Sequence, residues 1–216
     1  MSLRIGDRAA DFSAESTQGR IHFDEWLGKS WCLLFSHPRD FTPVCTTELG
    51  YLARMQHAFA ERNCKVLGLS VDPVADHRTW LADIKEVTGY DVRYPLIGDQ
   101  DLSIARLYDL LPATPSNGWG RSETVSTLYI IGPDRIVQAA LMYPMSSGRN
   151  FDEVLRLLDS CQLTAEYKVA TPANWKLGDD VLIVPTLSDD EARRRFPEGW
   201  KALKQPYMRI VPQPHA

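Results

Sequence analysis

The chain has 216 residues, of which 44% are hydrophobic and 24% charged, a composition typical of soluble globular proteins. Its formal net charge is −4 and it has no basic block, which argues against nucleic acid or an anionic membrane as the main partner. No apolar run approaches the roughly 20 residues that span a bilayer, and the N-terminal segment lacks the apolar core of a signal peptide. We therefore expect a cytoplasmic protein of one domain, or of one domain with an appendage.

The first predicted elements lead to a buried strand. Residues 20–23 alternate between polar and apolar side chains and predict an edge strand, and residues 26–29 predict a turn. The apolar run Cys32–Phe35 then predicts a buried strand over residues 31–36. Pro38 cannot donate to a strand ladder and biases the residue before it away from helix, so a loop follows the strand.

The next segment has the features of a reactive cysteine site. Thr42 is a favoured N-cap and Pro43 a favoured first helical residue, so a helix that begins there places Cys45 in its first turn. Unpaired backbone N–H groups and the positive end of the helix dipole stabilise a thiolate at that position. Pro38, Thr42 and Cys45 form P-x-x-x-T-x-x-C, with Thr42 where a C-x-x-C redox site has its first cysteine. Because a hydroxyl cannot form a disulfide, this spacing predicts one nucleophilic sulfur beside a hydroxyl.

Strands and helices alternate along the remainder of the main domain. Strands are predicted over residues 65–71, 94–97, 125–131 and 136–143, and helices after Cys45, around Trp80, over about 102–109 and over about 150–165. Residues 111–122 are rich in Pro, Gly and Ser and predict a loop. This order, with a hairpin formed by the last two strands, predicts an α/β layered domain.

Composition changes after Val169, and we place a domain boundary there, with domains over residues 1–168 and 169–216. The C-terminal segment predicts a short strand, a short helix opened by the capping box Ser188–Glu191, and a Pro-rich tail with a strand-like centre. Such a segment is too small to hold a core alone, so it must pack on the main domain or on a second subunit.

The remaining cysteines carry no redox or metal signature. Cys32 is predicted to be a buried strand residue, Cys161 to lie on the apolar face of a helix, and Cys64 to be structural or incidental. The chain contains no C-x-x-C and no Cys/His spacing that suits zinc. We therefore expect no metal site.

The stretch His37–Leu49, HPRDFTPVCTTEL, resembles the active-site signature of the peroxiredoxins, and in particular that of their one-Cys class. Further matches follow in the same order: GRNFDE at 148–153, QLTAE at 162–166 and ATPANWK at 170–176. The resemblance spans nearly the whole chain. It implies a thioredoxin-like fold and a small C-terminal α+β domain that reaches across a homodimer.

The resemblance also implies an antioxidant, thiol-dependent peroxidase without a cofactor. Such an enzyme reduces hydrogen peroxide and organic hydroperoxides through a sulfenic acid at Cys45, which an external thiol resolves. The catalytic residues it implies beside the cysteine are Thr42, Pro38, Arg149 and Glu48, and the residues that line its substrate pocket are His37, Val44 and Phe41. In the family, the position of Glu48 holds an arginine in place.

One position departs from the family pattern. The family's catalytic arginine lies six residues before the position of Gly132, and this chain has Ser126 there. Arg149 matches a second family arginine, and Arg121 lies on a loop from which it could reach the site. The loss of the arginine favours an alternative function, a redox sensor or chaperone dimer with weakened turnover.

Two hydrolase functions are further alternatives. Some one-Cys peroxiredoxins hydrolyse phospholipids through a Ser/His/Asp set, and Ser30 and Asp134 match two of its positions. The histidine position falls on Asp24, with His22 two residues earlier and on the same face of a strand. A cysteine hydrolase that pairs Cys45 with His37 is the other alternative, and no partner motif supports it.

Overall fold

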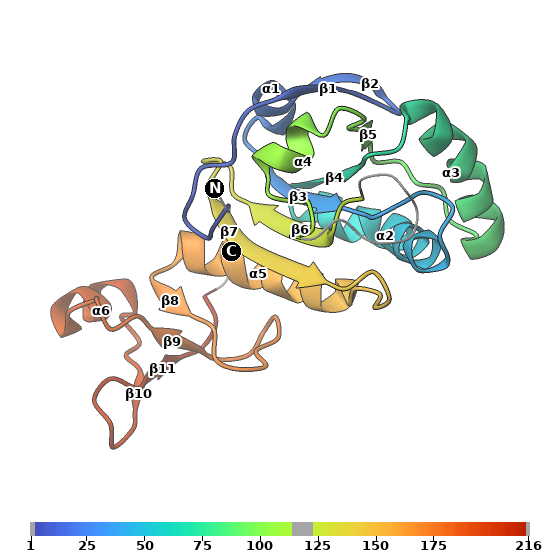
Figure 1. Ribbon diagram of the computed structural model, residues 1–216. Coiled ribbons are helices and arrows are strands. Elements are labelled where there is room, and N and C mark those ends of the chain that lie inside the picture. The colour runs from blue at the N-terminus through green and yellow to red at the C-terminus, as the bar shows by residue number, and fades with distance from the viewer. Residues whose placement is uncertain (1–2, 114–122, 215–216) are drawn as a thin grey trace. The chain divides into compact units, whose positions relative to one another are not determined.

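The computed structural model describes residues 3–113 and 123–214 (Figure 1). The chain divides into two compact units, Met1–Phe151 and Asp152–Ala216, and each is described by itself. Among the described residues, no helix is both long enough and apolar enough to cross a membrane.

A seven-stranded mixed sheet forms the centre of the first unit, with the strand order β2-β1-β5-β4-β3-β6-β7. Its strands are β1 Ser13–Ser16, β2 Gly19–His22, β3 Trp31–Ser36, β4 Cys64–Ser70, β5 Leu96–Gly98, β6 Ser126–Ile131 and β7 Val137–Tyr143. β3 pairs in parallel with β4 and antiparallel with β6, and every one of its residues is buried. Burial on both faces explains why its sequence is a continuous apolar run rather than an alternating one.

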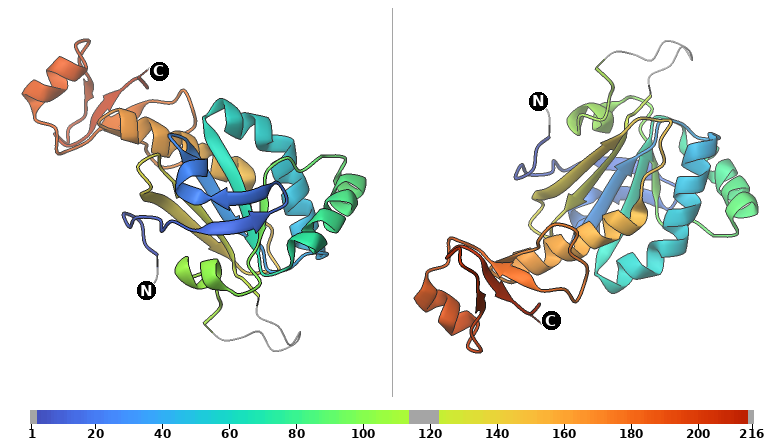
Figure 2. Two further views of the ribbon diagram at one scale, coloured as in Figure 1. Left: turned by 90° about the horizontal axis from the view of Figure 1, so that it is seen from above. Right: turned by 90° about the horizontal axis from the view of Figure 1, so that it is seen from below.

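Helices cover both faces of this sheet (Figures 1 and 2). They are α1 Phe23–Leu27, α2 Pro43–Glu61, α3 Val74–Thr88 and α4 Ser103–Leu107. α1 and α4 pack on one face, where Phe23 and Ile104 join Leu34 and Leu67 in one apolar cluster. α2 lies on the opposite face and packs against α3. The end of β3 and the start of α2 are therefore held at a fixed junction.

The second unit is a small α+β arrangement with its own apolar cluster. Its elements are α5 Phe151–Glu166, β8 Val169–Ala170, β9 Val181–Ile183, α6 Asp189–Arg195, β10 Lys201–Ala202 and β11 Arg209–Val211, with the strand order β10-β11-β9-β8. The cluster contains Trp175, which is 1% exposed, together with Leu163, Val169, Val181, Ile183, Leu187, Ala192 and Val211. Ser188 and Glu191 form the predicted capping box at the start of α6.

The α/β class predicted from the sequence is confirmed, and the strands predicted over residues 31–36, 125–131 and 136–143 are β3, β6 and β7. Two elements of the first unit, β1 and α1, were not predicted, and neither were the two-residue strands β8 and β10 of the second unit. β1 has the sequence SAES, which is too polar to show an apolar alternation, and residues 26–29 were predicted as a turn although α1 extends through Leu27. The predicted loop over residues 111–122 lies outside the described residues from position 114 onward.

The predicted domain boundary differs from the division between the compact units. We placed it between residues 168 and 169, whereas the second unit begins at Asp152. Helix α5 accounts for the difference, because Leu163 belongs to the apolar cluster of the second unit. The limits of the independently folding domains stay a prediction.

Candidate active site

The junction of β3 and α2 places Cys45 in the first turn of a helix. Thr42 is the N-cap residue, Pro43 begins the helix, and the first helical bond runs from Thr46 N–H to Thr42 O at 2.9 Å. Cys45 is 1% exposed. An N-cap threonine is expected to accept a hydrogen bond from the first turn with its hydroxyl, but the Thr42 hydroxyl makes no such bond. It donates to Arg39 O at 3.0 Å instead. The hydroxyl is therefore held by its own loop rather than by the helix.

The electrostatic surroundings of Cys45 differ from the prediction. The helix N-terminus predicted a stabilised thiolate, but burial raises the pKa of the Cys45 thiol above its ordinary value. The nearby Thr42 hydroxyl, the backbone of Arg39 and the charge of Arg149 act in the opposite direction and lower this pKa, whereas the charge of Glu48 adds to the rise. Burial removes more hydration from the sulfur than these groups replace, so the thiolate depends on the hydrogen-bond donors around it.

Glu48 and Arg149 form a buried bidentate ion pair. Arg149 donates from Nε to Glu48 Oε1 at 3.0 Å, from Nη2 to Oε2 at 2.6 Å, and from its backbone N–H to Oε1 at 2.7 Å. Its Nη1 donates to Ser36 O at 2.9 Å and to Thr127 O at 3.2 Å. A guanidinium has five N–H donors, so one N–H on Nη2 is left without a partner among the described residues. The structure thus brings together the carboxylate and the arginine that the sequence assigned to each other.

Ser126 occupies the position at which the family pattern has an arginine. It is the first residue of β6, is 4% exposed and pairs with Tyr143 across the hairpin. The strand begins one residue after its predicted start at 125, and no shift in register brings an arginine to this position. Arg121, the other candidate cation, lies outside the described residues. Arg149 lies within the described residues, and its positive charge lowers the pKa of Cys45.

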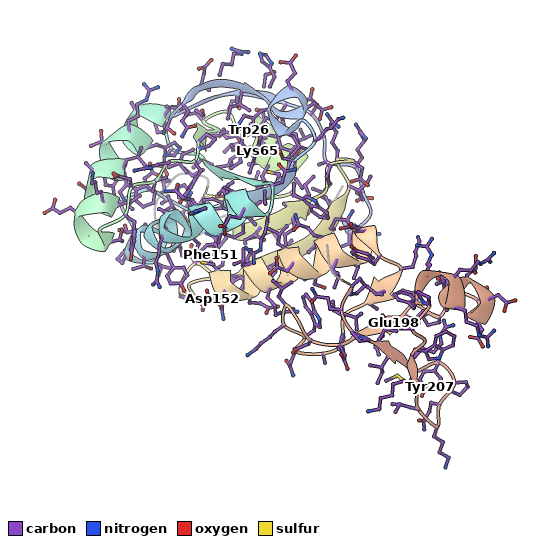
Figure 3. The ribbon with its side chains drawn as sticks, turned by 180° about the vertical axis from the view of Figure 1, so that it is seen from behind. Trp26, Lys65, Phe151, Asp152, Glu198 and Tyr207 are labelled. Carbon is purple, nitrogen blue, oxygen red and sulfur yellow. The ribbon has the colours of Figure 1, made fainter. Side chains whose placement is uncertain are left out.

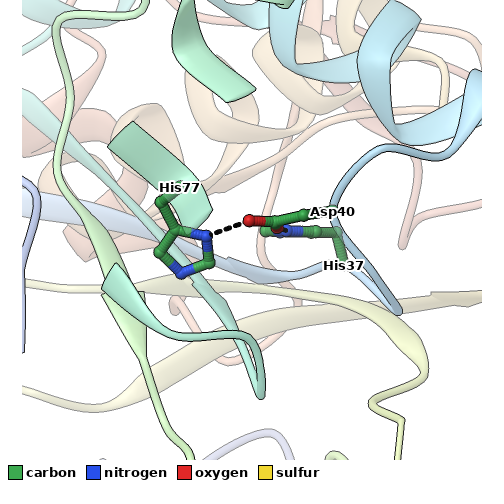
Figure 4. A group of neighbouring side chains, drawn as sticks. All are labelled: His37, Asp40 and His77. Atoms are coloured by element: carbon green, nitrogen blue, oxygen red, sulfur yellow. Dashed lines mark hydrogen bonds and ion pairs between the residues drawn. The ribbon is translucent and has the colours of Figure 1, made fainter. Parts of the chain in front are cut away.

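His37 belongs to a buried network with Asp40 and His77 (Figure 4). His37 Nε2 lies 2.7 Å from Asp40 Oδ1, and His77 Nδ1 lies 2.5 Å from Asp40 Oδ2. His77 Nε2 lies 3.0 Å from Ile97 O. Both histidines are 0% exposed and Asp40 is 6% exposed. His37 is thus satisfied on one side by a carboxylate rather than by backbone or solvent, and its place in a substrate pocket stays a prediction.

Sequence reasoning did not single out Asp40 and His77, which the structure places beside His37. A signal for His77 was present, because it precedes Trp80 by three residues and Ile84 by seven on the apolar face of α3. A histidine on a buried face needs hydrogen-bond partners from elsewhere in the fold. The carboxylate that supplies one of them comes from the loop before α2.

The His–Asp–His set has the donor types of a metal site, but its distances are those of hydrogen bonds. The ligand atoms of His37, Asp40 and His77 all lie within 4.8 Å of one another. Two ligands of one tetrahedral zinc lie roughly 3.4 Å apart when each bond is about 2.1 Å long. The 2.5 Å and 2.7 Å separations are shorter than that and fit charge-assisted hydrogen bonds.

The remaining predicted site residues are Pro38, predicted as catalytic, and Val44 and Phe41, predicted to line the pocket, and all three lie between β3 and the first turn of α2. Pro38 is buried, Val44 is half-buried and Phe41 is 53% exposed. Phe41 has φ 55°, a left-handed backbone conformation that is uncommon for bulky residues, and its ring centroid lies 6.1 Å from that of Trp80. Their contacts with a peroxide stay predictions.

The other three cysteines lie in regular elements away from a helix N-terminus. All four cysteines are free thiols, with Cys32 in β3, Cys64 at the start of β4 and Cys161 within α5. Burial raises the pKa of all three, to about 12 for Cys64 and to about 11 for Cys161. Burial raises the pKa at Cys45 as well, so what distinguishes Cys45 from these three is its place in the first turn of α2, beside the Thr42 hydroxyl.

The residues proposed for a phospholipase do not form a Ser/His pair. Ser30 Oγ donates to Asn63 Oδ1 at 2.9 Å, and His22 Nδ1 bonds instead to a serine hydroxyl of β1. Ser30 lines a cleft of about 470 Å³, in which Lys65 Nζ lies over the Trp26 ring at 5.2 Å from its centroid (Figure 3). Cys45 and its neighbours do not line this cleft.

Two family models match the chain. The AhpC/TSA family matches residues 5–140, and the C-terminal domain of 1-Cys peroxiredoxin matches residues 160–199. A 1-Cys peroxiredoxin of Dictyostelium discoideum is 49% identical over 213 residues, which cover 99% of this chain and 86% of that protein. Peroxiredoxin-6 of Gallus gallus is 46% identical over 220 residues, which cover 98% of each chain.

Solved structures give the same family. A Cys-to-Ser mutant of the peroxiredoxin 6 of Arenicola marina is 42% identical, has a TM-score of 0.93 and covers 100% of both chains. A yeast mitochondrial 1-Cys peroxiredoxin, with a thiol resolving mechanism via glutathione/thioredoxin systems, is 42% identical with a TM-score of 0.90 and covers 97% of this chain and 99% of its own. These likenesses confirm the thioredoxin-like fold and favour a thiol-dependent peroxidase over a sensor or chaperone. The chain therefore belongs to the peroxiredoxin family, in its 1-Cys branch.

Proposed function

We propose that Cys45 is the residue at which this peroxidase reacts with hydrogen peroxide and organic hydroperoxides. The observation that supports this is the place of Cys45 in the first turn of α2, beside the Thr42 hydroxyl and within the field of Arg149. Cys32, Cys64 and Cys161 lie in strands or in the body of a helix.

In the proposed reaction, the Cys45 thiolate attacks the terminal oxygen of the hydroperoxide. An S–O bond forms and the O–O bond breaks, and the leaving oxygen takes up a proton and departs as water or an alcohol. The cysteine becomes a sulfenic acid. An external thiol attacks that sulfur and releases water, and a second thiol reduces the resulting mixed disulfide.

The surrounding residues have defined roles in this proposal. The remaining N–H of Arg149 and the hydroxyl of Thr42, once it rotates away from Arg39 O, donate hydrogen bonds to the sulfur and the peroxide oxygens. Such preorganised donors stabilise the charge that develops in the transition state. Glu48 holds the guanidinium in place, and Pro38 shields the sulfur from bulk water. Phe41, Val44 and His37 border the peroxide.

We also propose that the reductant is an external thiol such as glutathione or thioredoxin. The yeast relative with a glutathione/thioredoxin resolving mechanism supports this assignment. The second unit contains one cysteine, Cys161, whose raised pKa makes it a poor resolving thiol.

We further propose that the protein is a homodimer and that it is located in the cytoplasm. The small second unit exposes Leu177, Leu203 and Tyr207 by 59%, 40% and 64%, and a partner subunit would cover such side chains. Four free thiols are usual in a reducing compartment and support a cytoplasmic location.

The proposal is tested by locating the oxidised sulfur. Protein treated with one equivalent of hydrogen peroxide in the presence of dimedone, which traps sulfenic acids, is digested and analysed by mass spectrometry. We expect the adduct on Cys45, and we expect an external thiol added before dimedone to prevent it. An adduct on Cys64 or Cys161, with Cys45 unmodified, would contradict the assignment.

A further inference from the structure

The contacts of His77 require a proton on each of its ring nitrogens, and one of these nitrogens faces Asp40 (Figure 4). A carbonyl oxygen can only accept, so His77 Nε2 donates to Ile97 O at 3.0 Å. A carboxylate also only accepts, so His77 Nδ1 donates to Asp40 Oδ2 at 2.5 Å. With Asp40 ionised, His77 is therefore an imidazolium.

His37, unlike His77, carries a proton on only one ring nitrogen. Its Nε2 donates to Asp40 Oδ1 at 2.7 Å, and its Nδ1 is buried with no partner among the described residues. A second proton on Nδ1 would find no acceptor, and an unpaired charge in the interior is costly. His37 is therefore neutral, with its lone pair on Nδ1. The two histidines share one carboxylate and differ by one charge.

The charged groups that face the network favour the same proton placement. Asp40 N–H donates to Asp72 Oδ2 at 2.8 Å, and Arg39 pairs with Asp72 at 3.4 Å and with Glu123 at 3.3 Å. Asp40 and Asp72 are buried carboxylates whose negative charges both favour a proton on His77.

The pKa directions agree with this proton count. Burial alone would lower the pKa of His77, but the hydrogen bond and charge of Asp40 outweigh it and raise that pKa above its ordinary value. Burial lowers the pKa of His37, and Asp40 offsets only part of the effect. At Asp40, the hydrogen bonds from both histidines outweigh burial and lower the pKa to about 2.

We propose that His77 is a buried imidazolium that acts as a positioning residue for the peroxidase site. Through Asp40 it holds His37 in the neutral tautomer and anchors the loop over residues 37–42, which leads directly to Cys45. This inference rests on the proposed role of Cys45. It assigns a function to a side chain of α3, an element that the proposed reaction does not otherwise use.

The proposal predicts how the stability of the His37–Asp40–His77 network depends on pH. The folded-state pKa of His77 is raised, so its stabilising contribution is complete below about pH 6.5 and is lost as pH rises through the raised pKa. The pKa of His37 is lowered, so its preference for the neutral form contributes above about pH 6.5 and is lost as pH falls. The network is therefore most stable near the ordinary histidine pKa.

Nitrogen-15 NMR of the histidine rings tests the proton placement without reference to peroxidase activity. At neutral pH we expect both His77 ring nitrogens to be protonated and only Nε2 of His37 to carry a proton, with one deprotonation of His77 above about pH 6.5. A neutral His77 at pH 7, or a proton on His37 Nδ1, would overturn the proposal. Zinc that shifts both rings and survives dialysis would overturn it in favour of a metal site.

Two substitutions separate positioning from packing. His77→Asn places an amide donor where Nδ1 bonds to Asp40, and His77→Gln places one where Nε2 bonds to Ile97. We expect His77→Gln to lower the rate constant for reaction with peroxide by about 10–10²-fold, and His77→Asn to lower it less. Equal losses in the two variants would indicate a packing role and overturn the proposal.

The exposed His57 of α2 supplies a matched control. Its side chain is 83% exposed and lies 3.8 Å from Glu61, so His57→Gln should leave the rate constant unchanged. The result also separates this inference from the function on which it rests. If Cys45 is oxidised as proposed but His77 is neutral, only the positioning role fails, whereas an unreactive Cys45 with the expected ring states contradicts the peroxidase assignment.

Discussion

Replacing Arg149 by alanine tests the strongest ion pair at the site. The side chains of Arg149 and Glu48 are 0% and 3% exposed, and two of the guanidinium donors bond to the carboxylate. Arg149→Ala leaves Glu48 as a buried carboxylate whose one remaining donor among the described residues is the backbone N–H of residue 149, and it removes the donor to Ser36 O and Thr127 O. Because breaking a buried pair on one side leaves an uncompensated charge, we expect the free energy of unfolding to fall by about 3–5 kcal/mol.

The same substitution should slow the reaction with peroxide. It removes the unpartnered N–H and the positive charge near Cys45, and losing one preorganised donor costs about 10²–10³ in rate. Stopped-flow measurement of Cys45 oxidation gives the rate constant, and urea unfolding followed by tryptophan fluorescence gives the stability. Arg149→Lys, which keeps the charge but not the planar fork, should be intermediate in both measurements.

Arg156→Ala is the matched control for burial. Arg156 forms a comparable two-pronged pair with Glu153, at 2.6 Å and 2.7 Å, but these side chains are 27% and 41% exposed. Pairs that water reaches contribute about 0–1 kcal/mol, and Arg156 also donates to Trp175 O at 3.1 Å, so this variant should lose less stability than Arg149→Ala and no activity. If Arg149→Ala and Arg156→Ala lose the same free energy of unfolding, or if Arg149→Ala reacts with peroxide at the wild-type rate, our account of the site is wrong.

Three further outcomes are expected. Ser126→Arg should raise the rate constant with peroxide, since it adds a donor and a charge at the position where the family has them; an unchanged stopped-flow rate would count against the role we give to this position. Turnover with an external thiol should survive the joint replacement by alanine of Cys32, Cys64 and Cys161, and a collapse of turnover in the folded variant would indicate a resolving cysteine. Truncation after Val169 removes most partners of Leu163, so it should expose apolar surface and abolish the dimer in light-scattering measurements. A truncated chain that stays dimeric and equally stable would refute that expectation.

The parts of the fold that sequence predicts are those with local signals. β3 is recognisable because its apolar run is continuous, and the start of α2 because threonine and proline occupy the N-cap and first helical positions. β1 and α1 lack such signals. β1 is a polar four-residue strand that forms because β2 and β5 pair with it, and this pairing is a tertiary effect.

The site, like the fold, has some features that a local sequence pattern predicts and others that depend on tertiary packing. The spacing of Thr42 and Cys45 is local and is visible in the sequence. The pairing of Glu48 with Arg149 joins residues 101 positions apart, and only the family resemblance indicated it. The bond of Asp40 with His77 and the raised pKa of Cys45 depend on burial, which arises when separate elements pack together, so no local pattern could predict them.

The most direct test of the central claim is peroxide consumption by Cys45→Ser in the presence of an external thiol. The matched control is Cys64→Ser, which removes a thiol of raised pKa at the start of β4. We predict that Cys45→Ser consumes peroxide no faster than the thiol alone, while Cys64→Ser retains the wild-type rate. Consumption by Cys45→Ser at the wild-type rate would contradict the account.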